Sequence, residues 1–167
     1  TPYHVLRLDP STDPPTISRI NLPHRSYGLG LDYLNHLFVS GYYGWLSRID
    51  ISTGVVEWSK SVPGSGNRGV AATGDNNVWI ANTDSSTVTR HDNNGNLLAT
   101  IYGFSGPTGV AVDAAGKVWT TDLSSEYIHR IDPSTNSIDL DKNLIGSNGH
   151  YTYSDMTGVQ LMQVVIF

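Results

Sequence analysis

The sequence contains no cysteine in its 167 residues. Disulfide bonds and thiolate metal sites are therefore excluded, although an exported protein with a large strand core can be stable without cross-links. Basic residues are also few, since ten lysines and arginines stand against fifteen acidic residues and the net charge is −5. Nucleic acids and anionic membrane surfaces bind clustered basic side chains, so neither is expected as a partner.

Long apolar runs are missing as well. The longest, at 164–167, is much shorter than the roughly 20 apolar residues of a membrane-spanning helix, so insertion into a membrane is not expected. No basic segment followed by an apolar one comes after Thr1, so any secretory signal peptide would have been removed or would lie outside this sequence. No stretch shows sustained helical periodicity, which favours an all-β chain.

The dominant feature of the sequence is a repeat of about forty residues. A glycine that opens a short apolar strand occurs at Gly28, Gly69 and Gly109, with spacings of 41 and 40 residues. A fixed period of this length, divided into several short strands, is typical of β-propeller blades. Ten positions after each glycine, an aromatic residue stands in a second apolar run: Phe38, Trp79 and Trp119.

The third strand of each repeat carries an arginine with an aspartate two positions later, at Arg7, Arg48, Arg90 and Arg130. Residues two apart in a strand share a face, so we expect each arginine to take part in a solvent-facing or inter-blade ion pair. The repeat aromatics are expected to pack between neighbouring blades. Asparagine, aspartate and glycine separate the strands, as tight hairpins require.

We therefore predict one all-β domain of the β-propeller type over residues 1–167, built from four-stranded blades. Its predicted parts are a half blade at 1–24, complete blades at about 25–65, 66–106 and 107–150, and a C-terminal strand segment at 151–167.

Two arrangements of the chain ends stay open. In the first, the C-terminal segment supplies the missing inner strands of the half blade and closes a ring of four blades, which would leave no exposed sheet edge. In the second, the chain is a fragment of a larger propeller, which the absence of turn formers at 162–166 favours. An open arc of blades would leave sheet edges that can pair with other copies as a homo-oligomer.

The third repeat resembles a known family. Residues 109–119, Gly-Val-Ala-Val-Asp-Ala-Ala-Gly-Lys-Val-Trp, and residues 128–133, Ile-His-Arg-Ile-Asp-Pro, are similar to the NHL-type repeat. They are equally similar to blades of the streptogramin (virginiamycin B) lyase group, and the likeness covers about residues 3–145. The resemblance implies a six- to seven-bladed propeller, often part of an exported bacterial protein at the cell surface or outside it, whose repeats act as binding modules.

The streptogramin lyases are the enzymatic branch of the family that the third repeat resembles. This resemblance implies a magnesium ion with histidine and glutamate near the mouth of the central channel, and catalytic histidines just before the first-strand glycine. The matching positions here are Tyr27, Arg68, Thr108 and Thr157, and none is histidine. The lyase chemistry is therefore not carried over, since one fold hosts many activities.

A ligand-facing rim is expected where the loops between second and third strands meet the loops that join the blades. Tyr42, Tyr43 and Trp45 cluster in one blade and break the repeat, and such an aromatic patch can bind carbohydrate rings or a protein partner. The predicted rim consists of Tyr27, Tyr42, Arg68, Asn82, Asp84, Thr108 and Asp122.

No cofactor and no catalytic residue are predicted. The oxygens of Asp84 and Asp122 would suit a magnesium or calcium ion, but loop capping and turn chemistry are the favoured explanation of these residues. His150, in a loop at the expected channel mouth, is the remaining candidate for catalysis. His91 and His129 lie in or beside third strands and are interpreted as hydrogen-bonded structural residues.

The sequence thus predicts a non-catalytic β-propeller module that binds a protein or carbohydrate ligand or has a structural role. Two alternatives stay open. One is a metal-dependent lyase of the streptogramin type, and the other is a self-assembling structural subunit whose open blades pair between chains.

Overall fold

The computed structural model describes residues 3–152, which form fourteen β-strands and no helix. The N-terminal hairpin pairs β1 (His4–Asp9) with β2 (Thr16–Asn21). Blade one contains β3 (Leu29–Leu31), β4 (His36–Gly41), β5 (Trp45–Asp50) and β6 (Val55–Ser61). Blade two contains β7 (Asn67–Ala72), β8 (Val78–Asn82), β9 (Thr87–His91) and β10 (Leu97–Ile101). Blade three contains β11 (Pro107–Val112), β12 (Val118–Asp122), β13 (Tyr127–Asp132) and β14 (Ser137–Asn143).

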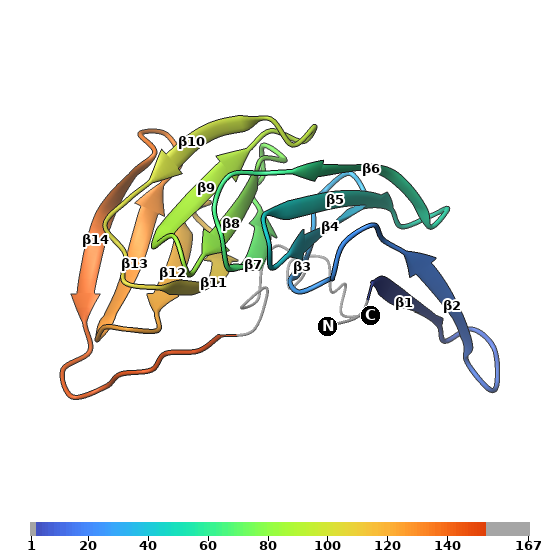
Figure 1. Ribbon diagram of the computed structural model, residues 1–167, viewed down its shortest axis with the longest axis horizontal. Helices are drawn as coiled ribbons and strands as arrows, with labels where there is room; N and C mark the ends of the chain where they lie inside the picture. The colour runs from blue at the N-terminus through green and yellow to red at the C-terminus, as the bar shows by residue number, and fades with distance from the viewer. Residues whose placement is uncertain (1–2, 153–167) are drawn as a thin grey trace.

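Each blade is an antiparallel meander, and the sheets follow one another along an arc from β14 to the N-terminal hairpin (Figure 1). The first strands β3, β7 and β11 lie on the concave side of this arc, and the fourth strands lie on its convex side. The predicted all-β propeller fold is therefore confirmed. In the part of the chain that the structure describes, no helix is long and apolar enough to cross a membrane.

The hairpin between the first and second strands has the same geometry in all three blades. The backbone φ is positive at Asn35, Asn76 and Gly116, at 65°, 61° and 76°. These residues occupy the same repeat position, and asparagine and glycine are the types that tolerate this conformation. The turn chemistry of the repeat therefore sets the register of each blade.

The core lies between the blades. Phe38 and Leu46 of blade one pack with Val70, Val78 and Ile80 of blade two. In the same way, Trp79 and Val88 of blade two pack with Val110, Val118 and Ile131 of blade three, and all of these side chains are fully buried. The expected packing of the repeat aromatics between blades is confirmed for Phe38 and Trp79, while Trp119 in blade three is half-buried.

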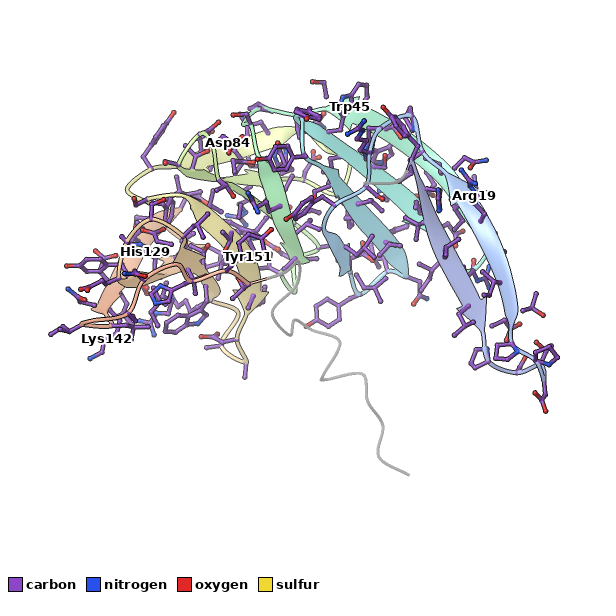
Figure 2. The ribbon with its side chains drawn as sticks, turned by 60° about the horizontal axis from the view of Figure 1, so that its bottom comes forward. Arg19, Trp45, Asp84, His129, Lys142 and Tyr151 are labelled. Atoms are coloured by element: carbon purple, nitrogen blue, oxygen red, sulfur yellow. The ribbon has the colours of Figure 1, made fainter. Side chains whose placement is uncertain are left out.

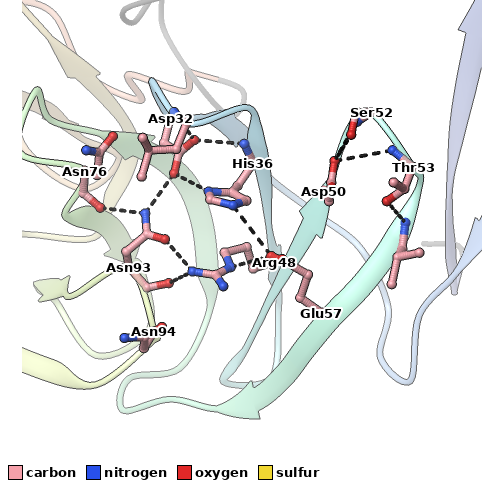
Figure 3. Close-up of polar contacts among 12 residues, drawn as sticks. Asp32, His36, Arg48, Asp50, Ser52, Thr53, Glu57, Asn76, Asn93 and Asn94 are labelled. Atoms are coloured by element: carbon pink, nitrogen blue, oxygen red, sulfur yellow. Dashed lines mark hydrogen bonds and ion pairs between the residues drawn. The ribbon is translucent and has the colours of Figure 1, made fainter.

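The expected pairing of each third-strand arginine with the aspartate two positions later is wrong. Asp50 accepts the backbone N–H of Ser52 at 2.7 Å, because the tight turn needs an acceptor for that donor (Figure 3). Arg48 instead pairs with Glu57 of its own blade at 2.6 Å. The aspartate of the repeat is therefore a turn residue, and the arginine takes its acidic partner from elsewhere in the sheet.

The same arginines join successive blades. In each case Nη1 donates to a backbone carbonyl in the turn between the third and fourth strands of the next blade, as Arg48 does in Figure 3. The contacts are Arg7 to Ser52 at 3.3 Å, Arg48 to Asn93 at 2.8 Å and Arg90 to Pro133 at 2.6 Å. This repeated hydrogen bond gives the recurring arginine an inter-blade role.

The choice between a closed ring and a fragment of a larger propeller depends on the C-terminal segment. Apart from Tyr151 and Thr152, that predicted segment lies outside the residues that the structure describes, and so does Thr157.

Candidate functional site

Three tyrosines surround the guanidinium of Arg68. It lies 5.5 Å from the ring centroid of Tyr27, 5.4 Å from that of Tyr42 and 4.9 Å from that of Tyr151. Arg68 Nη1 also donates to Tyr27 Oη at 3.0 Å and to Tyr151 Oη, and the hydroxyls of Tyr27 and Tyr151 bind each other. We call these four residues the Arg68 cluster.

The repeat explains why this cluster forms. Tyr27 and Arg68 each come directly before the first-strand glycine of neighbouring blades, and adjacent first strands lie side by side near the propeller axis. A Cβ at Gly28 would collide with the carbonyl oxygen of Arg68, so glycine permits this close approach. Two residues 41 positions apart are therefore brought into contact.

The cluster carries one positive charge. Burial alone would lower the pKa of Arg68, but the tyrosines Tyr27, Tyr151 and Tyr42 outweigh it and raise the pKa above its ordinary value. Burial, followed by the hydrogen bond with Tyr27, raises the pKa of Tyr151. The guanidinium is thus cationic and the Tyr151 phenol is neutral at physiological pH, and Arg68 Nε is buried without a partner among residues 3–152.

An aromatic pocket of about 300 Å³ adjoins this cluster and shares Tyr42 with it. The Tyr42 ring lies 5.8 Å from Tyr27 and meets Tyr43 edge-on at 5.3 Å. Tyr43 is 71 % exposed, and the guanidinium of Arg25 lies 5.8 Å from the Tyr3 ring. The aromatic pocket is lined by Tyr3, Pro23, His24, Arg25, Gly41, Tyr42, Tyr43 and Trp45.

His24 lines this pocket and lies against Gly41, whose position in the repeat holds Asn82 and Asp122 in the other two blades. A Cβ at Gly41 would lie 2.5 Å from His24 Nδ1, so only a glycine at the end of β4 admits the ring. Its Nδ1 donates to the carbonyl of Arg25 at 3.1 Å, and its Nε2 accepts from Ser47 Oγ at 2.6 Å. Burial lowers the pKa of His24, so the imidazole is neutral and stacks on Trp45 at 5.7 Å.

The structure brings together five of the seven predicted rim residues. Tyr27, Tyr42 and Arg68 are in direct contact, and Tyr42 Oη donates to Asp84 Oδ1 at 3.4 Å. Thr108 is the blade-three counterpart of Arg68, and its buried hydroxyl donates to the carbonyl of His150 at 3.2 Å. The segment that carries Tyr151 therefore passes beside Thr108 on its way to Arg68.

The other two predicted rim residues lie elsewhere. Asn82 is fully buried inside blade two, where its amide bonds Asn67 at 2.9 Å and Thr89 at 3.1 Å. Asp122 is buried at the end of β12 in blade three. Asp122 Oδ2 lies 3.1 Å from His129 Nε2 of the third strand, apart from the Arg68 cluster.

The residues near the axis do not suit the magnesium ion that the resemblance implies. Tyr27 and Thr108 offer only hydroxyls, and the cationic Arg68 between them repels a divalent cation. Among residues 3–152, no three His, Asp or Glu side chains are grouped so as to hold a metal ion. His150, the remaining candidate for catalysis, forms a hydrogen bond through Nε2 with Ser147 Oγ at 2.8 Å.

A second polar cluster surrounds His129. Its Nε2 lies 3.1 Å from Asp122 Oδ2 and its Nδ1 lies 2.6 Å from Asp141 Oδ1. Burial alone would lower the pKa of His129, but the two carboxylates raise it above its ordinary value. His129 is hydrogen-bonded, as the sequence predicts, but its partners are charged, and blades one and two hold Ser59 and Thr100 at the position of Asp141.

Sequence reasoning missed several residues of these sites. Tyr3, His24, Arg25 and Tyr151 lie in segments that connect or flank the repeats, so no periodic signal marks them.

The sequence matches no protein-family model and no curated protein. Solved structures share the fold. Virginiamycin B lyase from Staphylococcus aureus is 19 % identical with a TM-score of 0.76, over 91 % of this chain and 52 % of the lyase. A streptogramin B lyase is 15 % identical with a TM-score of 0.76, over 93 % and 53 % of the two chains. The dihydro-heme d1 dehydrogenase NirN is 17 % identical with a TM-score of 0.69, over 89 % of this chain and 35 % of that one.

The chain therefore spans about half the length of the lyases that it resembles. The structural likeness to streptogramin lyases that the third repeat predicts is confirmed at the level of the β-propeller fold.

Proposed function

We propose that this chain is a non-catalytic β-propeller module that binds a carbohydrate in the aromatic pocket and against the Arg68 cluster. The observation that carries the proposal is the pocket itself. It combines the exposed rings of Tyr3 and Tyr43 and the half-buried Trp45 with the guanidinium of Arg25, and Tyr42 connects it to Arg68.

The chemistry of these side chains suits a sugar. Flat aromatic faces pack against the C–H face of a pyranose ring, and tyrosine hydroxyls bond its hydroxyl groups. The guanidinium groups of Arg25 and Arg68 favour a sugar that carries a carboxylate, since arginine binds carboxylates with two parallel hydrogen bonds. A ligand of this kind also fits the exported bacterial setting that the resemblance implies.

Lyase chemistry has less support than binding. Elimination needs a general base and stabilisation of the developing negative charge. The positions that match the family's histidines hold Tyr27, Arg68 and Thr108 instead, and Arg68 is held in its cationic form. The side chains at the axis therefore favour binding an anion over abstracting a proton.

Titration of the protein with a uronic acid oligomer, hexagalacturonate, followed by tryptophan fluorescence, tests the proposal. We expect saturable binding that Tyr43→Ala weakens about tenfold, the value of one aromatic anchor. Tyr102→Ala is the matched control, because Tyr102 is 72 % exposed but lies outside the pocket. Equal losses in the two variants, or equal affinity for the neutral cellohexaose, would contradict the proposed recognition.

Assembly of chain copies is a second candidate function, and the inter-blade arginines favour it. Arg90 donates to the turn Asp132-Pro133-Ser134-Thr135, and the tip of the N-terminal hairpin carries the same four residue types at 9–12. Both turns are closed alike, since Ser11 N and Ser134 N each donate to the preceding aspartate at 2.9 Å. The hairpin of a second copy therefore offers Arg130, the blade-three counterpart of Arg90, an equivalent acceptor at Pro10.

The faces that would meet in such an assembly can be tested directly. The N-terminal hairpin exposes three apolar side chains, Leu6 at 59 %, Leu8 at 58 % and Ile17 at 63 %. Its other face packs against blade one through Val5 and Ile20. Sedimentation equilibrium should give a mass above 18.2 kDa that Leu8→Asp returns to the monomer value. A monomer at all accessible concentrations would exclude assembly.

A further inference from the structure

A second cavity, of about 340 Å³, opens beside blade three at the position of His129 in Figure 2. It does not share a residue with the aromatic pocket, so a ligand bound here is independent of the proposed carbohydrate function. Its lining combines carboxylates and aromatic rings with two serines. The acidic pocket, as we call it, is lined by Gly103, Phe104, Ser105, Asp122, Ser125, Tyr127, His129 and Asp141.

The charged residues of this pocket depart from the repeat. Asp122 and His129 occupy the positions that Asn82 and Thr89 hold in blade two. There, a neutral hydrogen bond of 3.1 Å joins the second and third strands. Ser47 takes the position of His129 in blade one, so only blade three among the three blades carries charges here. A structural role would be served by the neutral pair, so the charges call for another explanation.

The imidazole ring of His129 is fixed on all sides. Phe104 meets it edge-on at 5.1 Å and Tyr127 stacks on it at 6.0 Å. Both ring nitrogens are within hydrogen-bond distance of carboxylates, one of Asp122 and one of Asp141. Because both nitrogens face acceptors, the imidazolium form fits the geometry best.

The pocket holds more negative than positive charge. Burial would raise the pKa of Asp122, but hydrogen bonds from His129, Ser125 and the Ser105 backbone lower it below its ordinary value. Two carboxylates and one imidazolium leave a surplus of one negative charge. Asp122 is only 2 % exposed, and its Oδ1 has no hydrogen-bond partner among residues 3–152. A buried carboxylate oxygen without a donor is costly, so this oxygen calls for a cation or donor from outside the chain.

We propose that the acidic pocket binds a primary ammonium group, either that of a lysine side chain or that of a free amine. An ammonium group has three donors, which suits the unpartnered oxygen of Asp122 and the half-exposed carboxylate of Asp141. The ring of Tyr127 lines the same space and adds a cation–π contact. A metal ion fits less well, because both nitrogens of His129 are already hydrogen-bonded and no three ligands converge in the described residues.

Nuclear magnetic resonance titration with n-butylammonium chloride tests the proposal on the whole chain, with the ring signals of His129 as the readout. We expect saturable shifts of these signals, and we expect the neutral 1-pentanol to cause none. Asp141→Asn should weaken the binding about tenfold, the effect of one charge-assisted hydrogen bond. Asp141 is exposed, so this variant is expected to fold.

Asp139→Asn is the matched control, since Asp139 lies on the same strand and the variant changes the net charge equally. A bulge in β14 turns Asp139 toward Arg130, which it binds at 2.8 Å, and away from the acidic pocket. We expect this control to bind n-butylammonium like the parent protein.

Three outcomes would overturn the proposal: no saturable shift, an equal response to 1-pentanol, or an equal loss in both variants. A parallel titration with the peptide acetyl-Gly-Lys-Gly-amide identifies the source of the ammonium group. Tighter binding of the peptide assigns the pocket to a protein partner, and tighter binding of n-butylammonium assigns it to a free amine.

Discussion

Arg90 of blade two donates from Nη1 to the carbonyl oxygen of Pro133 in blade three, across 2.6 Å. The same guanidinium binds Asp75 at 2.7 Å and lies 5.1 Å from the ring of Trp79. One side chain thus joins two sheets, an acidic partner and a buried aromatic ring.

Replacing this arginine should loosen the junction between blades two and three. Arg90→Met keeps the apolar stem but removes the donors, and we expect a loss of about 1.5–3 kcal/mol in the free energy of unfolding, as for a hydrogen bond of a charged group. Urea denaturation measures the effect. Arg19→Met is the control, because Arg19 is exposed and binds Asn21 within its own strand. A loss at Arg90 no larger than that at Arg19 would show that the inter-blade bond adds nothing to stability.

The repeat aromatics should differ in their contribution to stability. Trp79 is fully buried between blades two and three, so Trp79→Ala is expected to cost about 3–5 kcal/mol. Trp119 occupies the same repeat position but is half-buried, and Trp119→Ala should cost less. Thermal and urea unfolding of the two variants provide the comparison, and equal losses would contradict the inter-blade burial of Trp79.

The close approach of first strands at Gly28 should tolerate no side chain. Gly28→Ala places a methyl group against the carbonyl of Arg68, and we expect a loss of about 1–3 kcal/mol, as in other overpacked sites. At Gly74 the nearest atom to an added Cβ is 3.9 Å away, in ordinary contact. Gly74→Ala should therefore leave the urea midpoint nearly unchanged, and similar midpoints for both variants would argue against tight packing at the axis.

The stability of blade three should depend on the charge of His129. Its pKa is raised by folding, so its stabilising effect is complete below the ordinary value of 6.5 and is lost as the pH rises through the higher folded pKa. Asp141→Asn removes one of the two carboxylates and should make this loss smaller. Urea unfolding of the parent protein and the variant between about pH 5.5 and 8.5 gives the difference directly. A stability difference between the two proteins that stays constant across this range would rule out the imidazolium.

The repeat made the fold predictable. Its period, its glycines and its turn residues are local signals that recur three times, and each copy reinforces the others. The sequence placed Tyr27 and Arg68 in one rim, and in the structure these equivalent positions of neighbouring blades are in contact. The repeat thus predicted the fold and the inter-blade packing of Phe38 and Trp79, but not the partners of the third-strand arginines.

The remaining features of the sites depend on departures from the repeat. Asn82 and Asp122 were assigned to the rim as residues of the loop after the second strand, but they are the last residues of that strand and are buried. His24 and Tyr151 come from connecting segments, and only the folded chain shows which blade they contact. Asp141 lies opposite His129 because a bulge shifts the register of β14, and blades one and two have a bulge at the same place but no acidic residue there.

The arginine contacts all run in one direction, from each blade to the one that follows it in the chain. During synthesis on a ribosome, each newly made sheet therefore presents a guanidinium whose acceptor has not yet been translated. Each later sheet supplies the acceptor for an arginine of the sheet before it, so removing a late sheet leaves that earlier arginine without this hydrogen bond.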